Sequence, residues 1–220
     1  GHKVEDSGHE SLGKITIGRA FEVSSNVAFS KTVNENYKNK PEQFVNRLYE
    51  MGLNRKLGIE IRGEGQPDIK YTDSELWSGL SLPMMSMGYE VRMTPLQILA
   101  LYNAVANNGK MVKPMFAEEI RFHGKVEKKF DTEVLNSHIC SKETLSQVKL
   151  MLEGVVENGT ARNLDNSHYK IAGKTGTAQV SLNKEGYVKS LYQASFVGYF
   201  PADKPKYSCI VVVNAPSKQI

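Results

Sequence analysis

The apolar residues of this chain change their spacing once, between residues 160 and 169, and this change limits the folds that the chain can adopt. After it come three segments rich in β-branched and aromatic residues, which are typical of strands: 169–180, 191–200 and 206–215. The sequences that join them, SLNKEGYVKS and PADKP, are short and polar. Short connections favour antiparallel neighbours, so we predict a three-stranded antiparallel meander over residues 169–214.

Before this change, residues 15 to about 160 have mostly helical spacing. Helices are expected over three segments: 41–51, 94–109 and 141–159. The second is the clearest, because Thr94 can cap it, Pro95 suits its first position and Gln97 its third. A further helical pattern around residues 15–37 is interrupted at Ser24-Ser25-Asn26, and residues 53–87 are expected to be irregular.

The composition argues against several classes of protein. Hydrophobic residues make up 40% and charged residues 24% of the 220 residues, which indicates a globular fold. The net charge is +4, but the lysines are scattered and no basic stripe interleaved with aromatics exists, so nucleic-acid binding is not expected. Cys140 and Cys209 are far apart, and the five histidines lack metal-ligand spacing. We expect no metal and no cofactor.

The stretch GKTGTAQ, residues 173–179, places a cation, a hydroxyl and a bare backbone on a predicted strand. Lys174 supplies positive charge, Thr175 can hydrogen-bond a carboxylate, and Gly176 lets a ligand backbone approach closely. Unpaired strand groups can bind a peptide as an added strand, and the N–H of Thr177 is best placed to stabilise an oxyanion. The pattern predicts a grip for the carboxylate end of a peptide; the alternative is a plain strand with a surface lysine.

A Ser-x-Asn motif, Ser24-Ser25-Asn26, lies far upstream of Lys174. Penicillin-binding proteins and β-lactamases use Lys-Thr-Gly together with Ser-x-Asn and Ser-x-x-Lys. A second Ser-x-Asn, residues 181–183, falls in the connection between two predicted strands and is interpreted as incidental. A helical Ser-x-Asn far before a strand Lys-Thr-Gly favours the first match.

Three stretches together resemble the transpeptidase domain of class B high-molecular-weight penicillin-binding proteins of the division and elongation type. They are AFEVSSNVAFSK, GYEVRMTPLQILALYNAVANNGKMVKP, and IAGKTGTAQ followed by SFVGYFP. The resemblance implies an α+β fold in which an antiparallel sheet packs with helices, incomplete at both ends here. Residues 1–220 would be one partial transpeptidase domain, with Ser-x-Asn in a mainly helical part, 1–168, and Lys-Thr-Gly in the three-stranded part, 169–214.

The resemblance also implies roles for individual residues. Ser24 would relay protons, and the amide of Asn26 would hold the substrate backbone. Lys174, Thr175 and Gly176 would bind the carboxylate end, and the N–H of Thr177 would contribute to the oxyanion hole.

The family's nucleophile is the serine of a Ser-x-x-Lys motif, several tens of residues before Ser-x-Asn. The chain has four formal matches: Ser11–Lys14, Ser146–Lys149, Ser167–Lys170 and Ser181–Lys184. Ser11 precedes a glycine and a β-branched run, and the other three follow Ser-x-Asn. We therefore expect the nucleophile to lie upstream of Gly1 and the chain to be catalytically incompetent alone. The alternative is that Ser11 is a displaced nucleophile.

The activity implied by the resemblance is that of a peptidoglycan D,D-transpeptidase, a target of penicillin. Peptides ending in D-Ala-D-Ala would acylate the serine, β-lactams would mimic them, and cell-wall synthesis or division proteins would be partners. The parent protein would be anchored in the bacterial cytoplasmic membrane with this domain outside it, and the fragment would self-associate through an exposed sheet edge. The alternatives are a serine β-lactamase or D,D-carboxypeptidase of the same fold, and a non-catalytic β-lactam sensor or peptide-binding module.

Two further features receive structural interpretations. Asn158-Gly159-Thr160 matches a glycosylation acceptor, but an Asn-Gly that ends a helix is the preferred explanation. Asp73, Glu75 and Glu90 could form paired carboxylates, but nothing fixes their geometry, so structural or surface roles are expected.

Overall fold

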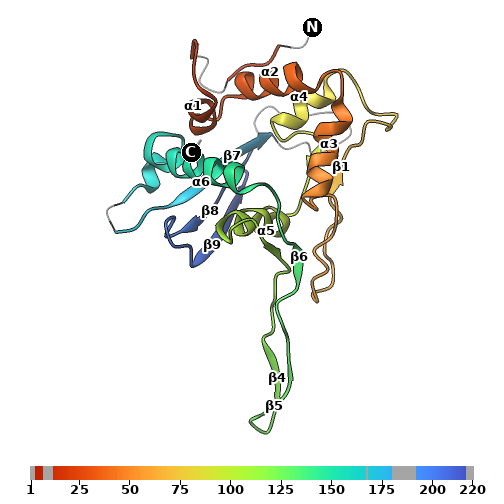
Figure 1. Ribbon diagram of the computed structural model, residues 1–220, viewed down its shortest axis with the longest axis vertical. Helices are drawn as coiled ribbons and strands as arrows, with labels where there is room; N and C mark the ends of the chain where they lie inside the picture. The colour runs from red at the N-terminus through yellow and green to blue at the C-terminus, as the bar shows by residue number, and fades with distance from the viewer. Residues whose placement is uncertain (1–2, 7–11, 167, 180–191, 217–220) are drawn as a thin grey trace.

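The computed structural model describes residues 3–6, 12–166, 168–179 and 192–216, and it has an α+β architecture (Figure 1). The helices are α1 (Ile17–Glu22), α2 (Asn26–Tyr37), α3 (Pro41–Glu50), α4 (Ser81–Ser86), α5 (Pro95–Ala106), α6 (Lys142–Asn158) and a 3-10 turn (Arg162–Leu164). The strands are β1 (Asp68–Ile69), β2 (Val91–Arg92), β3 (Met111–Val112), β4 (Glu119–Phe122), β5 (Lys125–Lys129), β6 (Val134–Asn136), β7 (Ala172–Gln179), β8 (Tyr192–Phe200) and β9 (Tyr207–Asn214).

The three C-terminal strands form an antiparallel sheet in the order β7-β8-β9. Thr175 of β7 pairs with Phe196 of β8, which pairs in turn with Val211 of β9. Within the described residues β7 and β9 are the outer strands, and Val211 and Val213 on β9 are exposed. The expected self-association through a sheet edge stays a prediction.

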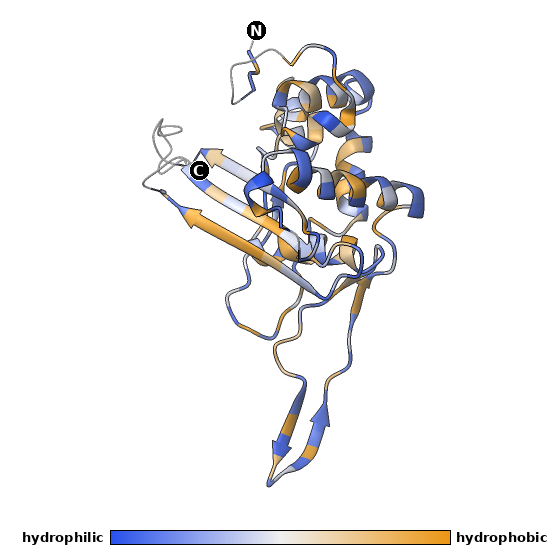
Figure 2. Cartoon of the chain, turned by 90° about the vertical axis from the view of Figure 1, so that its left-hand side faces the viewer, coloured by the Kyte–Doolittle hydropathy of each residue, from blue (hydrophilic) through white to orange (hydrophobic). Residues whose placement is uncertain are grey.

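The core lies between this sheet and helices α5 and α6. Helix α5 contacts β8 and β9, and α6 runs along β7. Tyr199 of β8, Ala104 of α5 and Leu152 of α6 are buried together in the main cluster. Figure 2 shows stretches of hydrophobic residues along strands of the sheet, and helices in which hydrophobic and hydrophilic residues are mixed. Burial of each large side chain contributes about 1.5–3 kcal/mol, so this contact carries much of the stability.

Side-chain caps fix the starts of α5, as expected, and of α6. Thr94 accepts from the backbone N–H of Gln97 (3.2 Å), while the Gln97 side chain accepts from the N–H of Thr94 (2.7 Å). This reciprocal pair fixes the start of α5, whose first residue is Pro95. Ser141 caps α6 with a single bond, in which its hydroxyl accepts from the N–H of Thr144.

The middle of the chain holds more strand than its sequence predicted. Residues 110–136 were expected within the mostly helical part, but they form β3, β6 and the hairpin β4–β5, which projects from the body in Figure 1. Every residue of β5 is exposed, as is Ile120 on β4. Helix α4 likewise occurs in a segment expected to be irregular. These elements are two to six residues long, too short for periodicity to reveal them.

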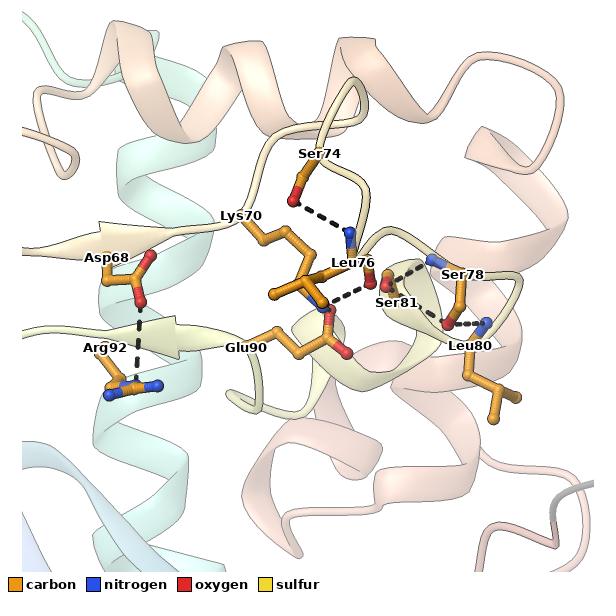
Figure 3. A network of polar contacts seen from close by, with 9 residues as sticks. All are labelled: Asp68, Lys70, Ser74, Leu76, Ser78, Leu80, Ser81, Glu90 and Arg92. Carbon is orange, nitrogen blue, oxygen red and sulfur yellow. Dashed lines mark hydrogen bonds and ion pairs between the residues drawn. The ribbon is translucent and has the colours of Figure 1, made fainter. Parts of the chain in front are cut away.

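A polar network orders the segment that leads to α4 (Figure 3). Lys70 forms an ion pair with Glu90 (2.8 Å) and donates to the carbonyl of Leu76 (2.9 Å). The hydroxyl of Ser81, at the start of α4, accepts from the N–H of Ser78 (3.0 Å). Because α4 packs against α2, this network supports the helix that follows the Ser-x-Asn motif.

Candidate functional site

The Lys-Thr-Gly motif lies on β7, where an aromatic ring covers two glycines. Gly173 and Gly198 are register partners on β7 and β8. A Cβ at Gly173 would lie 2.6 Å from the carbonyl oxygen of Val197 and would overlap the Cζ edge of the Phe196 ring. A Cβ at Gly198 would lie 2.5 Å from the carbonyl oxygen of Ala172. The glycine before Lys174 is therefore required by packing, a role that sequence reasoning missed.

Lys174 is half-buried and lacks an anionic partner among the described residues. Its Nζ donates to the carbonyl of Thr175 (3.1 Å) and lies 5.9 Å from the ring centroid of Phe21. Burial lowers the pKa of Lys174 to about 8. A carboxylate bound beside it would restore the charged form, which makes this position suited to an anionic ligand.

The three residues after Lys174 differ in exposure and contacts. The Thr175 hydroxyl lies 2.6 Å from the hydroxyl of Thr160. A side chain at Gly176 would lie 2.7 Å from Oγ of Ser195, which donates to the carbonyl of Gly176 (3.4 Å). Thr177 is exposed. Residues 175–177 of β7 therefore carry two hydroxyls and a glycine rather than bulky side chains.

The Ser-x-Asn motif forms the turn between α1 and α2. Ser24 has φ +56°, in the left-handed region, which costs about 1–2 kcal/mol for a residue other than glycine. Ser25 is buried and caps α2, since its hydroxyl accepts from the N–H of Ala28 (3.1 Å). Asn26 opens α2, and its amide donates to the carbonyl of Glu5 (3.5 Å). The turn places Ser24 between two helices.

An acidic residue near the N-terminus holds this turn, and no sequence signal pointed to it. One carboxylate oxygen of Asp6 accepts from the hydroxyl of Ser25 (2.9 Å), and the other accepts from the N–H of Val27 (3.0 Å). A carboxylate at a helix N-terminus is favoured by the helix dipole and by the free N–H groups.

Helix α1 connects the two motifs in space. Phe21, three residues before Ser24, lies below the ammonium of Lys174. The carbonyl of Glu22 accepts from the N–H of Thr160 (3.1 Å), and Arg19 donates to the carbonyl of Asn158 (2.9 Å). The end of α6, the start of β7 and the Ser-x-Asn turn thus meet around α1.

In the Ser-x-x-Lys matches, the side chains of Ser146, Lys149 and Lys170 contact residues outside the Ser-x-Asn and Lys-Thr-Gly motifs. Ser146 donates to the carbonyl of Lys142, and Lys149 donates to Asn108 (both 2.9 Å). Lys170 pairs with two acidic residues of α6, Glu153 and Glu157. Ser11, Ser167, the pair Ser181–Lys184 and the second Ser-x-Asn lie outside the described residues.

In the described part of the chain, no cluster of three or more His, Cys, Asp or Glu side chains is arranged to hold a metal ion. No helix of that part is long and apolar enough to cross a membrane. An open hollow of about 640 Å³ lies between residues 3–6, residues 12–15 and α2; it includes Ser25 but no residue of β7.

Comparison with known proteins agrees with this geometry. The penicillin binding protein transpeptidase domain family matches residues 2–219. Stage V sporulation protein D of Bacillus subtilis is 32% identical over 181 residues, covering 81% of this chain and 27% of that protein. Penicillin-binding protein PbpB of Mycolicibacterium smegmatis is 31% identical, covering 99% of this chain and 34% of that protein. The chain therefore spans about a third of the length of these relatives.

A solved structure shares the fold. The crystal structure of penicillin binding protein 3 from Mycobacterium tuberculosis, complexed with aztreonam, has a TM-score of 0.84 and 27% sequence identity. The match covers 98% of this chain and 48% of that one. The fold, the motif order and the family match agree: the chain belongs to the penicillin-binding protein transpeptidase family, and its relatives are class B proteins of the PbpB, PBP3 and FtsI type.

Proposed function

We propose that this chain forms the substrate-gripping part of a serine-type peptidoglycan D,D-transpeptidase. The observation that supports it most is the juxtaposition around α1. The half-buried ammonium of Lys174, on an edge strand, lies above Phe21, three residues from Ser24. A strand that is outermost among the described strands, beside a lysine with no anionic partner in the described part of the chain, suits an extended peptide that ends in a carboxylate.

In this proposal each motif residue has one task. Lys174 and Thr175 bind the terminal carboxylate, and Gly176 lets the peptide backbone pair with β7. The N–H of Thr177 stabilises the oxyanion, and Ser24 relays a proton. Asn26 binds the peptide backbone; its present bond to the carbonyl of Glu5 is long, at 3.5 Å, so a substrate carbonyl can replace it.

We also infer that the 220 residues alone do not form an acyl-enzyme. Acylation needs a serine and a lysine that can meet on one helix face. The one pair that the structure describes fully, Ser146 and Lys149, has separate partners: Ser146 donates to the carbonyl of Lys142, and Lys149 donates to the side chain of Asn108. A serine from outside these residues would therefore be the nucleophile in the full-length gene product.

The ligands follow from the same chemistry. Peptidoglycan stem peptides that end in D-Ala-D-Ala carry the required carboxylate, and β-lactams present a carboxylate beside a reactive carbonyl. The M. tuberculosis relative was also crystallised in complex with ampicillin, a β-lactam that carries such a carboxylate. We propose that the full-length protein is anchored in the membrane and works on the outer side of the bacterial cytoplasmic membrane, where it meets other cell-wall synthesis proteins.

Labelling with a fluorescent penicillin tests this function. The full-length gene product should be acylated stoichiometrically, Lys174→Ala should slow acylation at least a hundredfold, and the 220-residue chain should stay unlabelled. Peptide mapping by mass spectrometry locates the adduct. An adduct on Ser11 would contradict the inference about the nucleophile. Rapid multiple turnover of nitrocefin would indicate a β-lactamase instead, and a lack of labelling throughout would favour a binding module.

A further inference from the structure

The turn after α6, residues 159–161, touches the Lys-Thr-Gly strand and the end of α1, the helix that leads into Ser-x-Asn, and it has no task in the proposed function. The N–H of Thr160 donates to the carbonyl of Glu22, at the end of α1, and its hydroxyl lies 2.6 Å from that of Thr175 on β7. Thr160 therefore contacts the helix that leads into Ser-x-Asn and the middle residue of Lys-Thr-Gly.

The close approach of this turn to α1 depends on a glycine. A Cβ at Gly159 would lie 2.8 Å from the carbonyl carbon of Glu22 and closer still to its oxygen. The φ of Gly159 is −116°, so its backbone is open to other residues and only the contact excludes a side chain. Ala161, which follows Thr160, is fully buried, so Thr160 is held in place by both of its neighbours.

The bond between the two hydroxyls sets what Thr175 can offer a ligand. A hydroxyl has one proton to donate and two lone pairs that accept. When Thr160 donates to Thr175, the proton of Thr175 is free to point toward a carboxylate. The neighbouring Lys174 ammonium draws that carboxylate to the same edge, so this orientation is favoured whenever the anion is bound.

We propose that Thr160 is a positioning residue, which orients the hydroxyl of Thr175 toward the substrate carboxylate and ties that strand to the α1 end of the Ser-x-Asn turn. The proposal rests on the proposed function, since it assumes that a carboxylate binds beside Lys174. It explains the Asn158-Gly159-Thr160 sequence without glycosylation: glycine allows the approach, and threonine supplies the hydroxyl.

The direct test compares two ligands that differ only at the carboxylate. NMR titration measures binding of N-acetyl-D-alanyl-D-alanine, as the acid and as its terminal amide, to the 220-residue chain. Thr160→Val, which keeps the shape and loses the hydroxyl, should reduce the preference for the acid five- to tenfold and change amide binding less than twofold. Thr160→Ser should keep the preference within twofold, as should Thr132→Val, the same replacement at an exposed loop residue.

The outcomes separate this inference from the proposed function. An unchanged preference in Thr160→Val, equal weakening of both ligands, or no binding of the acid by the unmodified chain would each overturn the inference. The acyl-transfer function is judged independently, by penicillin labelling of the full-length gene product.

A second measurement tests the tie to α1. Gly159→Ala should speed hydrogen exchange at the Thr160 amide at least tenfold, because the added Cβ pushes the turn away from the carbonyl of Glu22. Gly18→Ala is the control: its Cβ would meet an atom no closer than 3.9 Å and should leave that amide protected. Equal exchange in the two variants would remove the structural basis of the proposal.

Discussion

The Lys-Thr-Gly strand and the Ser-x-Asn turn lie against the same helix, yet different forces hold them in shape. β7 pairs with β8 along all eight of its residues, and Phe196 covers the paired glycines. The turn relies on the hydrogen bonds of Ser25 and Asp6 while Ser24 adopts a left-handed backbone. Many backbone hydrogen bonds therefore hold the strand in shape, whereas the shape of the turn depends on a few side chains.

This difference predicts where each region is vulnerable. A strand held by many backbone bonds should yield only to a steric clash or to a change in burial. A turn held by two or three side-chain bonds should respond to the loss of a single polar group, and by a smaller amount.

The largest effect should come from Gly173→Ala. The new Cβ would clash with Phe196 and with the carbonyl oxygen of Val197, and the paired backbone cannot move away. We expect the free energy of unfolding to fall by about 2–3 kcal/mol in urea denaturation. Gly79→Ala, where a Cβ meets nothing within 4 Å, should change it by less than about 0.5 kcal/mol. Similar losses in both variants would show that the ring does not constrain β7.

Removal of a charge from the same strand should change the free energy of unfolding in the opposite direction, by raising it. Burial lowers the pKa of Lys174 from 10.5 to about 8, so the folded state disfavours its charge. The full shift is worth about 3 kcal/mol, and partial exposure reduces it, so Lys174→Met should stabilise the chain by about 1 kcal/mol at pH 7.

The pH dependence checks this cause. Between pH 8 and 10.5 the folded chain has already lost the proton that the unfolded chain keeps, so the stability of the unmodified chain rises relative to Lys174→Met. The gain from Lys174→Met should thus shrink across that interval, measured as urea midpoints. Lys170→Met, at an exposed lysine paired with Glu153 and Glu157, should show no such gain. A constant difference from pH 7 to 10.5 would argue against burial as the cause.

The sequence predicts some features of these regions better than others. It predicts those that depend on neighbouring residues and not those that depend on residues far apart in the chain. Local signals suffice for α5, whose capping residues are three positions apart, and for the strands β7, β8 and β9. They fail for Asp6, which acts on Ser25 across 19 residues, and for the bond between Thr160 and Thr175. Gly159 is an example of what the sequence does not predict. An Asn-Gly suggests a left-handed helix cap, but the φ of Gly159 is −116°, and a glycine is needed there because the backbone lies in close contact with Glu22. The motif residues can be identified from the sequence, whereas the groups that orient them can be identified only from the folded structure.

The turn should respond to the loss of Asp6. Asp6→Ala removes acceptors for the Ser25 hydroxyl and the Val27 amide, so we expect a loss of about 1 kcal/mol and faster hydrogen exchange at Val27. Glu5→Gln removes one negative charge from the same segment and keeps the backbone carbonyl that accepts from Asn26, so it should cost less than about 0.3 kcal/mol. If the two variants lose equal stability, net charge rather than the specific contacts supports the turn.

The smallest effect should be a gain from Ser24→Gly. Glycine adopts φ +56° without the penalty that serine incurs there, but it loses more freedom on folding, so the two effects partly cancel. We expect a gain of about 0.5 kcal/mol in urea denaturation. Ser146→Gly, the same replacement inside α6, should lose about 0.5 kcal/mol, because glycine disfavours a helix interior. A loss of stability in Ser24→Gly would mean that contacts of the Ser24 side chain outweigh its backbone strain. The Ser24 side chain would then stabilise the turn together with those of Ser25 and Asp6.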